Sequence, residues 1–225
     1  MGLAGQRRRR AGLRRKEERG KRIKNMQLTA EKTRRCVYVG IDPGFDGAVA
    51  VLDADGEILD VSVCPAIKIG GSTSTKREVD APRMAQVFVD AVNLARAAII
   101  VAWLEKVGSM PKQGIASTFK FGRCAGAWEG ILSTLSVLSA GLDSGSALRW
   151  ELIGPKTWQK AVCTDLPGKD PKQKAEIFCR RRWPSWIAAH EVKGGLLGSA
   201  KRREGVFDSL CMAEAARRER GAGAR

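Results

Sequence analysis

The chain has 225 residues, which is enough for one domain with a good hydrophobic core plus a tail, and too few for two large lobes. Hydrophobic residues make up 44% of the chain, and no apolar run approaches the roughly 20 residues needed to span a bilayer. We therefore expect a soluble, cytoplasmic protein with no membrane partner. Its formal net charge of +16 favours an anionic partner.

Most of this positive charge lies in residues 1–35. The segment contains 14 Lys or Arg and three Glu, a net charge of +11, and leaves +5 for the other 190 residues. It offers almost nothing apolar to bury, so we expect a basic, disordered tail at 1–35 and a folded domain at 36–220. Four interpretations of the tail stay open: an arm for the DNA backbone, a solubility tail, a start codon assigned too early, or a transit peptide.

The six cysteines are scattered and form no C-x-x-C pair. That spacing supports neither a zinc site nor a disulfide framework, so we expect reduced cysteines inside a cell. The cysteines are Cys36, Cys64, Cys124, Cys163, Cys179 and Cys211.

The domain begins with three predicted antiparallel strands. The first run is rich in β-branched and aromatic residues and ends at a Pro-Gly turn, and the third follows Asp55-Gly56, a strong hairpin signal. The three runs are 36–42, 48–52 and 58–63.

A flexible loop at 70–76, rich in Gly, Ser and Thr, precedes the first predicted helix. Asp80 is its expected N-cap, with Pro82 in the first turn and apolar residues at helical spacing after it. The continuous apolar run at 98–104 then predicts a central strand buried on both faces, and this strand ends at Glu105.

The second half of the domain alternates strands and helices. The predicted elements are a loop at 108–117, a helix after it, a strand at 148–153, helices from 155 and at 172–182, a linker at 194–199 and a helix at about 204–218. Gly122, Gly126 and Gly130 lie on one stripe of the first of these helices, which indicates close approach of another backbone, from this chain or from a second one. The element order predicts an α/β fold with a mixed sheet flanked by helices.

Two acids end buried strands, where a carboxylate is costly unless a cation or hydrogen bonds compensate it. Asp42 closes the first strand and Glu105 closes the fourth, so the two converge at one edge if these strands are neighbours. Asp208, predicted in the first turn of the last helix, adds a third oxygen ligand, and Glu204 lies one turn before it. Oxygen ligands without Cys or His favour Mg²⁺ or Mn²⁺.

Each of these acids also has a structural interpretation. Asp42 is suited to opening a turn, Glu105 to pairing with Lys106, and Asp208 to the start of a helix. His190, the only histidine, lies in a loop-like stretch where it is more simply incidental than a general base, and the tryptophans are most simply core residues.

Five separated motifs resemble the RuvC family of Holliday-junction resolvases, with closer likeness to its shorter, phage-type branch. They run in order over residues 37–216. The motifs are VGIDPG at 39–44, LEKV at 104–107, MPKQG with STFKFG at 110–122, PxxWxK at 155–160 and GxxDSLxMA at 205–213.

The resemblance implies an RNase H-like fold, in which three antiparallel strands are followed by parallel strands. It also implies a homodimer that places paired, symmetric nicks in branched DNA with two Mg²⁺ or Mn²⁺ ions per site. The family's catalytic acids fall on Asp42, Glu105 and Asp208. A bacterial or phage-encoded enzyme in the cytoplasm fits this resemblance.

One departure from the family concerns the fourth acid, which the better-known bacterial enzymes carry three residues before the last Asp. Gly205 stands there in this chain, so either Glu204 substitutes or the second metal is held less tightly.

Several residues near the motifs are candidates for DNA contact, through phosphate neutralisation or base stacking. Solvated helix faces for the lysines and core packing for the phenylalanines are the alternatives. The candidates are Lys112, Phe119, Lys120, Phe121, Lys156, Lys160 and Lys172.

Two other functions compete with a nuclease. A catalytically inactive protein that binds branched DNA would share the fold but lack a catalytic acid, and all three acids are present. A nucleotide-binding module of the actin and sugar-kinase type would need two lobes, which about 190 structured residues cannot form.

Overall fold

The computed structural model describes residues 36–70, 76–95, 97, 99–108, 114–141 and 147–222. The predicted basic tail at 1–35 lies outside these residues, as do Lys112 and most of the predicted loop at 70–76. The boundaries of the folded domain therefore stay a prediction.

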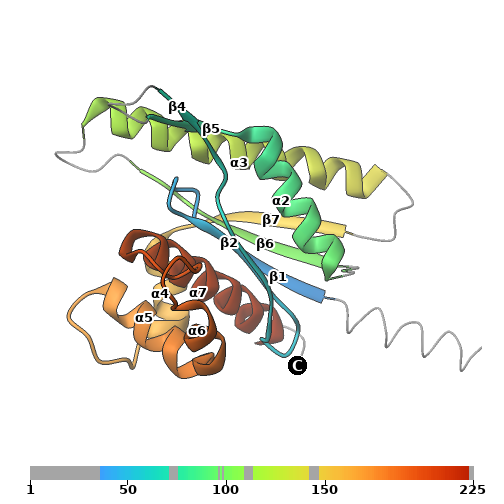
Figure 1. Ribbon diagram of the computed structural model, residues 1–225. Coiled ribbons are helices and arrows are strands. Elements are labelled where there is room, and N and C mark those ends of the chain that lie inside the picture. The colour runs from blue at the N-terminus through green and yellow to red at the C-terminus, as the bar shows by residue number, and fades with distance from the viewer. Residues whose placement is uncertain are drawn as a thin grey trace, which may run out of the picture.

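Within the described residues, five strands form a mixed sheet in the order β3-β2-β1-β6-β7 (Figure 1). The first three pair antiparallel, whereas β1, β6 and β7 pair parallel. The predicted RNase H-like mixed sheet, in which three antiparallel strands are followed by parallel strands, is confirmed. Its strands are β1 Cys36–Ile41, β2 Ala48–Leu52, β3 Ile58–Val63, β6 Ile99–Glu105 and β7 Ala147–Ile153.

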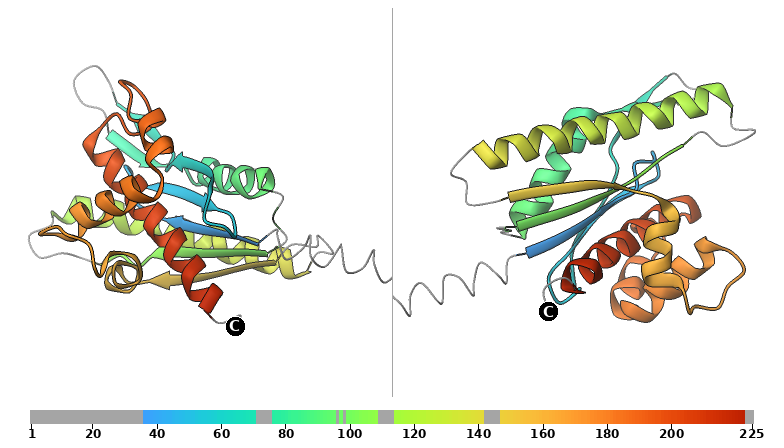
Figure 2. Two further views of the ribbon diagram at one scale, coloured as in Figure 1. Left: turned by 90° about the horizontal axis from the view of Figure 1, so that it is seen from below. Right: turned by 180° about the vertical axis from the view of Figure 1, so that it is seen from behind.

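Helices cover both faces of the sheet (Figures 1 and 2). One face packs against α2 and α3, and the other packs against the helices that follow β7. No helix in the described ranges is both long enough and apolar enough to cross a membrane. The helices are α2 Ala81–Leu94, α3 Ile115–Gly141, α4 Pro155–Cys163, α5 Pro171–Arg182, α6 Pro184–His190 and α7 Ala200–Ala222.

The central strands are apolar at successive positions because each face has its own core. In β1, Val37, Val39 and Ile41 point into the core under α2 and α3, while Tyr38 points into the core under α7. This alternation places the end of β1 between two buried layers, which fixes the backbone that leads to Asp42.

Helix α7 lies directly against β1 at Gly40. A side-chain carbon at Gly40 would lie 2.0 Å from the carbonyl oxygen of Ser209 and 2.6 Å from the backbone nitrogen of Ala213. Only glycine lets the two backbones approach this closely. The contact brings α7, and with it Asp208, to the end of β1.

Four features differ from the sequence predictions. The predicted loop at 108–117 ends earlier, because α3 begins at Ile115. Helix α7 begins at Ala200, so Asp208 lies about two turns into the helix and not in its first turn. Pro184 begins the short helix α6, which was not predicted because Trp183-Pro184 also ends α5. A two-stranded hairpin, β4 Ala66–Ile69 and β5 Lys76–Val79, was not predicted because each strand has only four residues and the second begins at the end of the predicted loop at 70–76.

The glycine stripe of α3 contacts no other part of the described chain. A side-chain carbon at Gly122, Gly126 or Gly130 would have nothing within 4 Å beyond its own helix. Close approach of another segment of this chain is therefore wrong for the described residues. The second alternative, a backbone from another molecule, stays a prediction.

Candidate active site

Asp42 is the first residue after β1, and its loop is tied at several points. Its backbone N–H donates to the carbonyl oxygen of Ala48 at 3.0 Å, and its own carbonyl accepts from the Cys64 thiol at 3.2 Å. Its side-chain Oδ1 accepts the N–H of Gly44 at 3.0 Å. These bonds fix both the backbone and the carboxylate of Asp42.

Glu105 ends β6 beside Asp42. Strands β1 and β6 pair parallel with Ile41 opposite Leu104, so the residues that follow this pair lie at the same edge of the sheet. The indole N–H of Trp158, which is buried in α4, donates to Oε1 of Glu105 at 3.1 Å. That bond orients the carboxylate.

Asp208 reaches the same edge from α7, and the three carboxylates affect one another's protonation. Burial, followed by the charge of Asp42, raises the pKa of Glu105 to about 7. Burial, followed by the charges of Asp42 and Glu105, raises the pKa of Asp208 to about 8. The three predicted acids thus come together in one partly enclosed cluster.

Burial also raises the pKa of Asp42, against the opposing effects of the Gly44 N–H and of Lys172. The Lys172 ammonium, at the start of α5, likewise opposes the rise in the pKa of Asp208. Lys172 thus acts on two of the three carboxylates, and the repulsion that remains among the three acids is of the kind that a divalent cation relieves.

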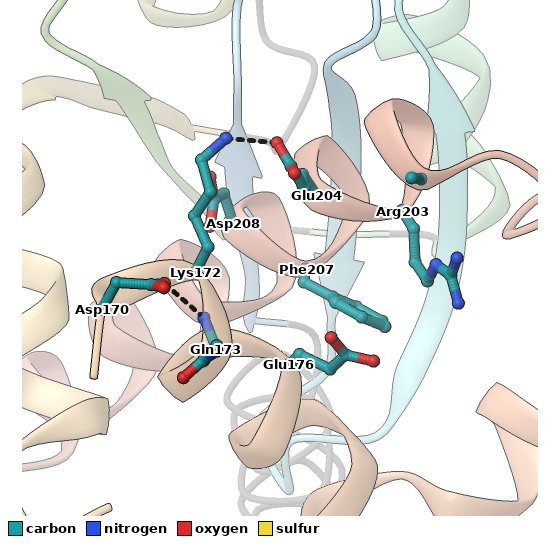
Figure 3. Close-up of a pocket in the computed structure, with 9 residues that line it drawn as sticks. Asp170, Lys172, Gln173, Glu176, Arg203, Glu204, Phe207 and Asp208 are labelled. Atoms are coloured by element: carbon teal, nitrogen blue, oxygen red, sulfur yellow. Dashed lines mark hydrogen bonds and ion pairs between the residues drawn. The ribbon is translucent and has the colours of Figure 1, made fainter. Parts of the chain in front are cut away.

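A cavity of about 330 Å³ lies beside Asp208, between the starts of α5 and α7 (Figure 3). Lys172 and Glu204 face each other across it and form an ion pair. Both side chains are substantially exposed, at 64% and 45%, so the pair contributes little to stability. Glu204 lies near the cluster, because its charge raises the pKa of both Asp42 and Asp208. Its carboxylate is already paired with the Lys172 ammonium.

Gly205, where the fourth acid of the bacterial enzymes would stand, has no room for a side chain. A side-chain carbon there would lie 2.4 Å from the carbonyl oxygen of Asp46, 2.7 Å from Cα of Gly47 and 3.0 Å from Oδ2 of Asp42. The backbone of the β1–β2 loop occupies this space. The departure from the family pattern is thus built into the packing of α7.

The cluster has the donor chemistry of a magnesium or manganese site, because its three acids offer carboxylate oxygens. The thiols of Cys64 and Cys124 lie near Asp42, but burial and the charge of Asp42 raise their pKa, so they stay protonated. In the part of the chain that the structure describes, no group of three or more His, Cys, Asp or Glu side chains is arranged to hold a metal ion as it stands. Asp42, Glu105 and Asp208 are the residues whose carboxylates would hold such an ion. The residues fit a divalent cation in chemistry and in charge.

Comparison with known proteins adds a likeness of fold. No family model and no curated protein matches the sequence. The solved structures that it resembles include Holliday-junction resolvases. RuvC of Thermus thermophilus in complex with a Holliday-junction substrate is 15% identical, with a TM-score of 0.48 over 82% of this chain and 96% of that one.

Two further resolvase structures match this chain with similar sequence identity, coverage and TM-score. A second RuvC structure from Thermus thermophilus is 13% identical, with a TM-score of 0.45 over 83% of this chain and 96% of that one. The yeast mitochondrial Holliday-junction resolvase Ydc2 is also 13% identical, with a TM-score of 0.45 over 84% of this chain and 80% of its own. At such identities the resolvase likeness concerns the fold.

The residues predicted to contact DNA are spread over three helices. Lys156 and Lys160 are exposed on α4, and Lys172 lies in the cavity of Figure 3. On α3, Phe119 is 67% exposed, which excludes core packing within the described chain, and Lys120 lies 4.0 Å from Glu78. Phe121 is partly buried and lies near Gly44, so it packs close to the Asp42 loop.

Two further aromatic residues were considered in the sequence, and His190 ends the short helix α6 where a loop-like stretch was expected. His190 stacks on Trp186 with ring centroids 4.2 Å apart, and its Nδ1 lies 2.8 Å from the Trp186 carbonyl oxygen, which fits the incidental interpretation. Trp158 was predicted only as a core residue, yet it also holds Glu105. Its place in the PxxWxK motif was the available signal.

Replacing Trp158 by Phe is expected to weaken metal binding at pH 7 by about 10-fold or more, as the loss of an outer-shell partner does. The indole bond lowers the pKa of Glu105, so its removal raises that pKa further above about 7 and lets protons compete with metal. Titration with Mn²⁺ at pH 7 and pH 9 should show a deficit that shrinks at the higher pH.

Trp103→Phe is the matched control, because Trp103 is also buried in the core under α7 and α4 but has no hydrogen bond to the cluster in the described chain. It should lose comparable stability and keep its affinity for Mn²⁺. Equal Mn²⁺ affinity in both variants and the unaltered protein would show that Trp158 serves packing alone.

Proposed function

We propose that this protein is a metal-dependent, structure-specific DNA endonuclease that cuts Holliday junctions or related branched DNA. The observation that carries the proposal is the cluster of Asp42, Glu105 and Asp208, drawn from β1, β6 and α7 to one edge of the sheet. Such a cluster is unfavourable unless a cation neutralises it, so it costs stability that a purely structural site would avoid. The compartment would be the bacterial or host cytoplasm.

The chemistry would be hydrolysis of a phosphodiester. One or two Mg²⁺ or Mn²⁺ ions held by Asp42, Glu105 and Asp208 would activate water and stabilise the leaving oxygen. The chain itself orients Glu105 through Trp158, holds Asp42 in a hydrogen-bonded loop, and presents the Lys172 ammonium beside the carboxylates. Lys172 is placed to neutralise a neighbouring phosphate once DNA draws it from Glu204.

The surface around the cluster suits branched DNA. Lys156 and Lys160 project from α4 into solvent and would contact phosphates, while the exposed ring of Phe119 and the neighbouring Lys120 would meet unstacked bases and backbone at the junction centre. Lys112 and the basic tail belong to the same proposal as further phosphate contacts.

A homodimer would place two clusters on one junction and give paired, symmetric nicks. Helix α3 offers the face for it, because its glycine stripe is open and large apolar side chains beside it are exposed. Apart from Phe119, which we assign to DNA contact, the exposed large apolar residues of α3 are Ile115, Val137 and Leu138.

The test incubates purified protein with a labelled four-way junction, a flap and a plain duplex, each with Mg²⁺, Mn²⁺, Ca²⁺ or EDTA. We expect paired nicks in the junction with Mg²⁺ or Mn²⁺, with ends that a ligase can seal, and none with EDTA. Nicks that persist in EDTA would remove the metal from the mechanism. Binding of the junction in Ca²⁺ without cleavage under any condition would favour the inactive branched-DNA binder.

A further inference from the structure

The side chain of Arg77, in β5, forms hydrogen bonds with the loop that follows Asp42. Its Nη1 and Nη2 donate to the two carboxylate oxygens of Asp46 at 2.7 and 2.9 Å, and Nη1 also donates to the carbonyl oxygen of Phe45 at 3.1 Å. The guanidinium lies 5.4 Å from the centre of the Phe45 ring. One side chain thus holds two consecutive loop residues by four contacts.

These contacts suit positioning better than stability. The Arg77 and Asp46 side chains are 40% and 37% exposed, and exposed ion pairs add little to the free energy of unfolding. The two parallel hydrogen bonds, however, fix direction as well as distance, because a guanidinium fork matches a carboxylate in one plane.

The same loop also lies against α7, whose Lys201 and Arg202 are near enough to help lower the pKa of Asp46. The Asp46 carbonyl and Gly47 fill the space beside Gly205, three residues before Asp208. The loop, with Asp42 at its start, is therefore held by contacts with both Arg77 and α7. A shift of this loop would change the position of Asp42 relative to Asp208.

The hairpin that carries Arg77 is itself anchored. Glu78, the next residue on β5, pairs with Arg123 of α3 at 2.7 Å and lies 4.0 Å from Lys120. Successive residues of a strand point to opposite sides, so the hairpin contacts the Asp42 loop with one side and α3 with the other. The hairpin thus contacts both the loop that follows Asp42 and α3, the helix that carries Phe119 and Lys120 (Figure 1).

We propose that Arg77 is a positioning residue for the cleavage reaction: it clamps the Asp42–Gly47 loop against α7 and so sets the spacing of Asp42 and Asp208. This inference rests on the proposed endonuclease function. In this chain, the loop backbone held by Arg77 takes the space that a fourth acid at position 205 would need.

The experiment compares Arg77→Gln with Arg123→Gln, which breaks an ion pair of similar exposure on the same hairpin without touching the loop. For Arg77→Gln we expect kcat on a four-way junction to fall about 10- to 100-fold, the loss typical of a misplacement of about 1 Å. The KM for the junction should stay unchanged, and the affinity for Mn²⁺ should fall about 10-fold. Arg77→Lys keeps the positive charge but loses the two parallel hydrogen bonds, so its kcat and Mn²⁺ affinity should lie between those of the unaltered protein and Arg77→Gln.

The outcomes separate cleanly. Unchanged kcat and Mn²⁺ affinity in Arg77→Gln would overturn the inference, as would equal losses in Arg123→Gln. If the unaltered protein cuts no branched DNA, the proposed function fails, and the Mn²⁺ titration decides the inference about Arg77. Weaker Mn²⁺ binding in Arg77→Gln, but not in Arg123→Gln, would support the clamp. Equal Mn²⁺ binding in all variants would overturn it. Circular dichroism melts of all variants identify any loss caused by unfolding.

Discussion

Replacing Asp208 by Asn is expected to reduce DNA cleavage by more than about 100-fold, the loss that outer-shell partners of a metal alone can cause. The same change should stabilise the metal-free protein at pH 8. The pKa of Asp208 is about 8 in the folded chain and about 3.8 ordinarily. Folding therefore takes up a proton between about pH 4 and pH 8, and the stability that this carboxyl contributes is lost as the pH rises through that window.

Asparagine does not titrate, so the variant should escape that loss. We expect a gain of about 1 to 3 kcal/mol in EDTA at pH 8, or about 2 to 4 °C in Tm per kcal/mol, and little gain at pH 5. Mg²⁺ should stabilise the unaltered protein at pH 8 and the variant much less. Thermal melts at both pH values, with EDTA or Mg²⁺, measure each effect.

The control for this prediction is Asp165→Asn, because Asp165 is exposed between α4 and α5. It should leave cleavage and both melts unchanged. A lower Tm for Asp208→Asn at pH 8 in EDTA would show that the ionised carboxylate is not strained by its neighbours, and the electrostatic basis of the proposed site would be lost.

The parts of the fold that follow from short stretches of sequence could be predicted. The strands before Asp42 and Glu105 are unbroken apolar runs, and such runs form central strands because each face packs against its own core. The start of α2 is equally local, since the Asp80 side chain accepts the N–H of Arg83 as a helix cap does.

The parts that depend on distant partners could not be predicted. The β4–β5 hairpin has strands of only four residues each, and Arg77 binds Asp46 from 31 positions away in the sequence. The early start of α7 lies in a polar stretch after Ser199 that has no apolar periodicity to reveal it.

The site divides in the same way. The convergence of three acids was predictable from their positions at the ends of elements, because parallel neighbours such as β1 and β6 end at one edge. Two other features of the site could not be predicted, because they depend on how α4 and α7 lie against the sheet. They are the hydrogen bond from Trp158 to Glu105 and the contact of the β1–β2 loop with Gly205.

We expect the substitution Gly205→Asp to abolish DNA cleavage. It supplies the fourth acid of the bacterial RuvC pattern, so the sequence pattern alone would predict faster cleavage. The new side-chain carbon would meet the Asp46 carbonyl at 2.4 Å and the Asp42 carboxylate at 3.0 Å, so the loop would have to move. Overpacking of this kind costs about 1 to 3 kcal/mol, and a fourth negative charge adds to the repulsion already present.

We expect cleavage by Gly205→Asp to fall more than about 100-fold, because a loop displaced by about 1 Å misplaces Asp42. Gly205→Ala separates the two causes, since it adds the carbon without the charge and should retain the steric part of the loss. Gly108→Ala, where a side-chain carbon would have nothing within 4 Å, should melt and cut like the unaltered protein. Faster cleavage by Gly205→Asp, or a lower Mg²⁺ requirement, would mean that the loop yields and that this position accepts a fourth ligand. The clamp by Arg77 would then not hold the loop in place.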